Sequence, residues 1–122
     1  MSIRQCIVMT LLSFLKAVSL DKLGVLCFIV DYLGGFEAFS WSLEGGSPIS
    51  PDFIDAVEEL RSSGAIRMSG ATVSLGTEQP KLDCGWMADK VRRTAASVVS
   101  NYAHLDLEEL INEAAFLYQD QQ

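Results

Sequence analysis

Residues 20–33 combine the length of a helix with apolar side chains around almost its whole circumference. The apolar members are Leu20, Leu23, Val25, Leu26, Phe28, Ile29, Val30 and Leu33. Ser19 is suited to cap the start of the helix, and Gly34-Gly35 are suited to end it. A helix of this kind must be enclosed by other elements. We therefore predict a central helix, with water reaching only Asp21, Lys22, Asp31 and Tyr32.

Four further segments carry apolar residues at helical spacing. They are residues 3–17, 51–63, 87–102 and a last helix that begins after Asp106. Pro51 stands at the first helical position, where its missing N–H is not needed. Asp106-Leu-Glu-Glu109 matches a capping box with aspartate as the cap. Together with the central segment, these patterns predict about five helices in a single domain that covers residues 1–122.

Two stretches have the patterns of β-strands. Phe39, Trp41 and Leu43 alternate with polar residues, which predicts a half-buried strand with Trp41 in the core. Residues 65–75 are typical of two short strands around a turn at Ser69-Gly70. A helix, a short turn and a hairpin in this order form the second half of a winged helix. We therefore predict a mainly α (α+β) fold: a helical domain with a winged-helix-like strand and a short β-hairpin.

The charge of the chain narrows the classes of partner. Sixteen acidic side chains against nine basic ones give a formal net charge of -7. This balance makes nucleic acid an unlikely partner, because binding to phosphates depends on Lys and Arg. It suits a soluble protein or a protein with a basic partner. No apolar run approaches the roughly 20 residues needed to cross a bilayer, so no membrane association is expected.

The cysteines and the single histidine argue against a metal site and against catalysis. Cys6, Cys27 and Cys84 are widely spaced, and only His104 exists to complete a zinc site. Cys6 and Cys27 lie in apolar runs, so we expect free core thiols, a reducing compartment and a cytoplasmic location. Cys84 is the best candidate for a reactive thiol, but no basic residue lies closer in sequence than Lys81. We predict no cofactor and no enzyme activity.

Several segments, in their order along the chain, resemble a known family. They are Leu20-Asp-Lys-Leu-Gly-Val-Leu-Cys-Phe28, the aromatic Phe39-Ser-Trp41, the turn Glu44-Gly-Gly-Ser-Pro48, the helix end Leu60-Arg-Ser-Ser-Gly-Ala-Ile66 and the closing segment from Val98 to Leu110. This arrangement is similar to the Panacea-type domain of phage-associated proteins and SocA-like antitoxins. The resemblance implies a helical, partly winged-helix-like domain from a phage or mobile element that neutralises or escorts a partner protein.

The leading hypothesis is a non-catalytic protein–protein interaction domain, antitoxin- or inhibitor-like, that binds a partner through an acidic surface. Four carboxylates on one short helix would meet the basic surface of the partner: Asp52, Asp55, Glu58 and Glu59. Trp86 joins this set because tryptophan is enriched at binding hot spots and here stands at the edge of a loop. The sequence is also compatible with a homodimer.

Two alternatives come from other classes of protein. A winged-helix DNA-binding transcriptional regulator would need a dimer that gathers Lys90, Arg92 and Arg93 into one positive surface. Against it, the helix that would enter the major groove carries the four carboxylates named above. A small enzyme would have to use Cys84 or His104.

Overall fold

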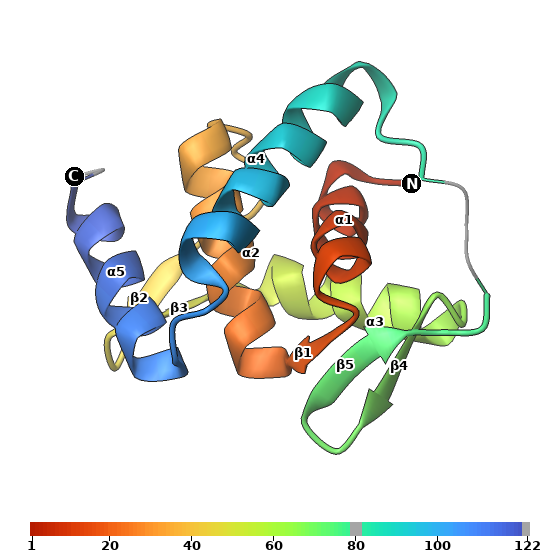
Figure 1. Cartoon of the computed structure of the whole chain (residues 1–122), viewed down its shortest axis with the longest axis horizontal. Coiled ribbons are helices and arrows are strands. Elements are labelled where there is room, and N and C mark those ends of the chain that lie inside the picture. The colour runs from red at the N-terminus through yellow and green to blue at the C-terminus, as the bar shows by residue number, and fades with distance from the viewer. Residues whose placement is uncertain (79–81, 121–122) are drawn as a thin grey trace.

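The structure of the chain is a computed structural model that describes residues 1–78 and 82–120. Within these residues the chain forms five α-helices and two small β-sheets, so the predicted mainly α fold class is confirmed (Figure 1). The elements are α1 (Ile3–Leu15), β1 (Ala17–Ser19), α2 (Leu20–Gly34), β2 (Ser42–Glu44), β3 (Ser47–Ile49), α3 (Pro51–Ser62), β4 (Ile66–Ser69), β5 (Thr72–Leu75), the 3₁₀ helix η1 (Gly85–Met87), α4 (Ala88–Tyr102) and α5 (Leu107–Asp120).

Helix α2 is the central element. It packs against α1, α4 and α5, and every residue from Leu23 to Asp31 is buried (Figure 1). The hydroxyl of Ser19 accepts the backbone N–H of Lys22, and Gly35 ends the helix in the left-handed conformation at φ 62°. The prediction of a central helix with these two ends is confirmed.

A three-stranded antiparallel sheet, in the order β1-β5-β4, lies at one end of the molecule. The predicted hairpin is confirmed: Ser69 pairs with Thr72, and Gly70 takes a positive φ of 60° in the turn. Strand β1 has only three residues and lies directly between two helices, so no sequence alternation marks it. Its hydrogen bonds to β5 connect the α1–α2 junction to the hairpin.

The predicted strand over residues 39–43 is wrong in its position. Strand β2 begins only at Ser42 and pairs with β3 in a second hairpin, whose turn contains Gly45 and Gly46 at positive φ. The backbone before it donates to side chains instead of to a strand: Phe39 N–H bonds to Asp31, and Ser40 N–H bonds to Asp52. Hydrogen bonds to side-chain carboxylates therefore take the place of the backbone hydrogen bonds that a strand would form here.

Helix α5 starts as the sequence predicts. Asp106 accepts the N–H of Glu109 at 2.8 Å, and the Glu109 carboxylate accepts the N–H of Asp106 at 3.3 Å. These reciprocal bonds satisfy two donors at the helix start, as a capping box does. The capping-box prediction is confirmed.

A disulfide joins Cys6 in α1 to Cys84, which stands just before η1, with Cα atoms 5.7 Å apart. Cys84, the best candidate for a reactive thiol in the sequence, is therefore not a free thiol. The expectation of a free thiol at Cys6 is wrong for the same reason. Cys27 is the one free cysteine in the described part of the chain, and it is buried. No helix in the described ranges is both long and apolar enough to cross a membrane.

Candidate functional site

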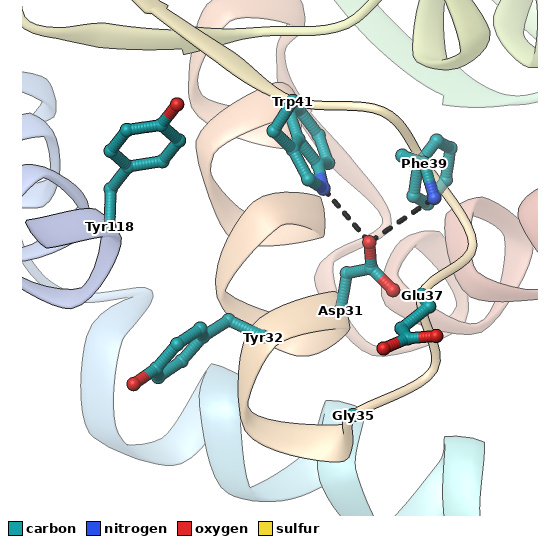
Figure 2. A pocket seen from close by; sticks show the side chains of 7 residues that line it. All are labelled: Asp31, Tyr32, Gly35, Glu37, Phe39, Trp41 and Tyr118. Carbon is teal, nitrogen blue, oxygen red and sulfur yellow. Dashed lines mark hydrogen bonds between the residues drawn. The ribbon is translucent and has the colours of Figure 1, made fainter. Parts of the chain in front are cut away.

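Asp31, near the end of α2, organises the segment that follows the helix. It is only 5% exposed, and its carboxylate accepts three N–H groups. These are the backbone of Ala38 at 2.9 Å, the backbone of Phe39 at 3.2 Å and the indole Nε1 of Trp41 at 2.9 Å. Figure 2 shows the bonds from Phe39 and Trp41. Helix α2 thus fixes the loop that carries Phe39 and Trp41, and it places a carboxylate below both aromatic rings.

The charge of Asp31 is not balanced by a cation of the described chain. Its three donors are neutral, and neither neighbouring cation forms an ion pair with it. Arg4 pairs with Asp52 at 3.5 Å and donates to the Ala38 carbonyl, while Lys90 lies over the Phe36 ring at 5.3 Å. A buried carboxylate without a cationic partner attracts a cation strongly, because little water screens it.

A pocket of about 630 Å³ opens beside Asp31, within the range of ligand sites in proteins (Figure 2). Four aromatic side chains line it: Tyr32, Phe39, Trp41 and Tyr118. The buried Phe28 ring supports three of them, with ring centroids 5.3 Å from Trp41 and 6.3 Å from both Tyr32 and Tyr118. Packing against a core residue therefore sets the shape of the aromatic wall. We call this site the aromatic–acidic pocket.

Glu37 supplies a second carboxylate to the aromatic–acidic pocket. It is exposed and forms no hydrogen bond or ion pair with the described residues. Its backbone has φ 53°, a left-handed conformation that a side chain other than glycine adopts at a cost. Such conformations cluster at ligand sites, where surrounding structure holds them. Glu37 is thus a free negative charge at the pocket rim.

Aromatic faces combined with carboxylates are suited to binding a cation. A guanidinium or ammonium group gains from the negative faces of the rings and from the charge of the carboxylates. The seven described residues that line the pocket include two carboxylates and two tyrosine phenols, but no histidine, cysteine, serine or lysine. Elsewhere in residues 1–78 and 82–120, no three His, Cys, Asp or Glu side chains gather as metal ligands.

Cys27 lies one helical turn before Asp31 and makes the stability of the protein depend on pH. Burial raises the pKa of the Cys27 thiol well above its ordinary range, and the negative charge of Asp31 raises it further. Above pH of about 8.5 the unfolded chain releases this proton and the folded chain keeps it, so stability falls as the pH rises. We expect a loss of up to about 1.4 kcal/mol per pH unit from this thiol.

Urea unfolding at several values between pH 7.5 and 10 measures this dependence. Cys27→Ala should show a shallower fall in the free energy of unfolding over that range than the wild-type protein does. Equal slopes in the two proteins would show that the thiol does not titrate differently on folding.

The four acidic residues predicted on α3 have different surroundings. Asp52 accepts Ser40 N–H and pairs with Arg4, Glu58 pairs with Arg61, and Glu59 accepts the amide of Gln5. Asp55 is exposed and forms no described hydrogen bond or ion pair. Asp52 is linked to the aromatic–acidic pocket through its partner Ser40, which stands between two residues of the pocket wall.

The other predicted residues lie apart from this pocket. Trp86 is 90% exposed on η1, and no hydrogen bond or ring contact of the described chain links it to α3. His104 is exposed in the turn before α5. Of the basic group, Arg92 pairs with Asp89, while Lys90 and Arg93 are exposed on α4.

Asp31, Glu37 and Tyr118 did not emerge as site residues from the sequence, and the expectation that Asp31 faces water is wrong. A signal for Asp31 was present: it is the one acidic residue between Leu23 and Leu33 of an otherwise apolar helix. A carboxylate in that position needs donors, and the loop that follows supplies them. Tyr118 joins the pocket through the packing of α5 on α2, which no local pattern specifies.

The chain matches no protein-family model, no curated protein and no solved structure.

Proposed function

We propose that this protein is a non-catalytic protein–protein interaction domain, antitoxin- or inhibitor-like, which holds a Lys or Arg side chain of a basic partner in the aromatic–acidic pocket. The observation that carries the proposal is Asp31, a carboxylate only 5% exposed, satisfied by three neutral donors and paired with no cation of the described chain. The resemblance to Panacea-type domains, whose members include antitoxins, points to the same class of function.

The charge around the pocket supports a basic partner. Glu37 at the rim forms no ion pair or hydrogen bond with the described residues, and Asp52 is bonded to the loop that forms the wall. Asp55 on the next turn of α3 is also free of described partners. With a net charge of -7, the protein would attract a basic surface over a distance and accelerate the encounter at low salt. The acidic face of α3 then belongs to the rim of the same interface.

Capture of the partner with matched variants tests the proposal. From extracts of cells that carry the gene, the wild-type protein should retain one basic protein in stoichiometric amount. Glu37→Gln removes a charge without changing the shape of the pocket, so we expect about tenfold weaker binding, equivalent to about 1.4 kcal/mol. Glu113→Gln, on the exposed side of α5, should leave binding unchanged.

Two results would contradict the proposal. Equal retention of the partner by the wild-type protein and by Glu37→Gln would remove the pocket from the interface. Recovery of nucleic acid without a protein would favour a regulator instead.

A winged-helix DNA-binding regulator is the second candidate. It is favoured by the order of α3, β4 and β5 and by the pairing of β1 with β5, which place a hairpin beside α3. The exposed carboxylates of α3 oppose it, because they would face phosphates. A salt-dependent mobility shift on the DNA upstream of the gene tests it, and the absence of a shift at low salt would exclude this candidate.

A cytoplasmic location is part of the leading proposal, and the Cys6–Cys84 disulfide is the observation that opposes it. Disulfides are rare in the cytosol, where thiols are kept reduced. Lysis of the cells directly into denaturant that contains an alkylating reagent, followed by mass measurement, distinguishes a cytoplasmic from an oxidising compartment. Three modified cysteines would support the cytoplasm; one modified cysteine after denaturation, with Cys6 and Cys84 still joined, would place the protein in an oxidising compartment.

A further inference from the structure

A second pocket, of about 340 Å³, shares a wall with the aromatic–acidic pocket. Trp41 lines both. The second pocket also has Gly24 of α2 and Ile111 of α5 in its lining, whereas the first has Tyr32 and Tyr118 from the later turns of the same helices. The two pockets therefore follow one another along the paired helices α2 and α5, with the Trp41 ring between them. We call the second one the apolar pocket.

The lining of the apolar pocket is dominated by hydrophobic side chains, and two of them remain open to water. Ile49 is 43% exposed and Ile54 is 47% exposed, although both could be covered by an occupant of the pocket. Among the described residues, Asp21 supplies the one carboxylate of the lining. An occupant with an apolar side chain would remove the two isoleucines from water, and a negatively charged occupant would be repelled.

Ser50, which lines the apolar pocket, carries an unused hydroxyl. It is 2% exposed, and its Oγ has no hydrogen-bond partner in residues 1–78 and 82–120. Ser50 is the N-cap of α3, yet it makes no capping bond, whereas Ser2 and Ser19 both cap their helices. A buried hydroxyl left without a partner is costly. If the Ser50 side chain turns toward the pocket, a carbonyl oxygen brought in by an occupant would accept its O–H.

The helices give a measure of the spacing between the pockets. Ile111 and Tyr118 are seven residues apart on α5, and at 1.5 Å per residue this is about 10 Å along the axis. In a polyproline II segment, which rises about 3.1 Å per residue with three residues per turn, residues three positions apart lie about 9 Å apart on the same face. One short segment of a partner can therefore reach both pockets.

We infer that the apolar pocket is a second recognition site for the same partner: it takes a leucine-sized apolar side chain about three residues from the cation, and Ser50 donates a hydrogen bond to a backbone carbonyl of that segment. The inference rests on the proposed function and specifies the chemistry of the partner as a neutral apolar residue next to a basic one. The shared Trp41 wall and the acidic residues of both pockets favour this occupant over a separate anionic ligand.

A titration with N-acetyl-leucine methylamide, followed by backbone NMR signals, tests the apolar pocket without any cation. The probe should shift signals of Gly24, Ser50 and Ile111 and should bind at least tenfold more tightly than N-acetyl-alanine methylamide. Ser50→Ala should weaken the leucine probe about three- to tenfold, the value of one hydrogen bond. Ser19→Ala, at a cap outside both pockets, should leave it unchanged.

The peptide acetyl-Arg-Gly-Gly-Leu-amide then joins the two sites. It should bind at least tenfold more tightly than the leucine probe, because the second contact becomes intramolecular. In Glu37→Gln this gain should shrink, while binding of the leucine probe stays the same. If the wild-type protein bound the peptide no more tightly than the leucine probe, the proposed function would be contradicted. Binding of the leucine probe would still support the apolar pocket as a site.

The inference itself fails under three results. One is the absence of shifts around the apolar pocket with the leucine probe. Another is equal affinity of that probe for the wild-type protein and for a folded Ser50→Ala variant. The third is binding of acetophenone, a small apolar ketone, with no binding of the leucine probe, since the site would then take a free small molecule.

Discussion

Replacement of Asp31 by alanine is expected to lower the free energy of unfolding by about 3 to 5 kcal/mol, measured by urea denaturation. The carboxylate accepts three N–H groups, and two of them, from Ala38 and Phe39, belong to buried residues. Hydrogen bonds to a charged group contribute about 1.5 to 3 kcal/mol each, and unpaired buried donors add their desolvation cost. The total loss is smaller than the sum of these contributions, because the loop can move and its N–H groups can find other acceptors.

Asp52→Ala is the matched control for this prediction. Asp52 also accepts a loop N–H, from Ser40, and pairs with Arg4, but its side chain is 24% exposed. Water can replace these contacts, so the loss should be about 1 kcal/mol. The emission of Trp41 should change in Asp31→Ala because its indole loses its acceptor. Equal losses for the two variants would contradict the role of Asp31 as the buried anchor of the loop.

Replacement of Cys84 by serine is expected to lower the free energy of unfolding by about 4 kcal/mol. The disulfide closes a loop between residues separated by 78 positions, and the chain-entropy account gives a value of this size for such a loop. The bond also holds the segment before η1 against α1, so its loss should loosen the start of α4. Urea denaturation under oxidising conditions measures the effect.

Reduction of the wild-type protein provides the control. With a reducing agent, the wild-type protein should approach the stability of Cys84→Ser, and the variant itself should not respond to the reagent. A wild-type protein whose stability is the same with and without reductant, together with an unchanged Cys84→Ser variant, would show that the disulfide contributes nothing to the fold.

The helices were predictable because their signals are local. Ser19 and Gly35 at the ends of α2, and Asp106 with Glu109 at the start of α5, act within one or two helical turns. The β4–β5 hairpin was predictable for the same reason, since Gly70 supplies the positive φ that its turn needs. These contacts lie between neighbours in sequence, and the residue types reveal them.

The aromatic–acidic pocket was less predictable because it depends on contacts between segments. The alternation at residues 39–43 indicated a strand, but Asp31 takes the backbone donors that a strand would use. Whether an acid at the end of an apolar helix faces water depends on the loop that folds over it. Cys6 and Cys84 are separated by 78 positions in the sequence, and the spacing of the three cysteines could not show which two are joined.

The most direct test of the central claim compares butylguanidinium with butylurea, its neutral counterpart of nearly the same shape. Each is titrated into the protein while the Trp41 indole N–H and the Tyr118 ring are followed by NMR. If the aromatic–acidic pocket receives a cation, butylguanidinium should bind saturably, at least tenfold more tightly than butylurea, and more weakly as salt is added. Equal affinity for the two compounds, or no change at Trp41 with either, would contradict a pocket built for the cationic side chain of a partner.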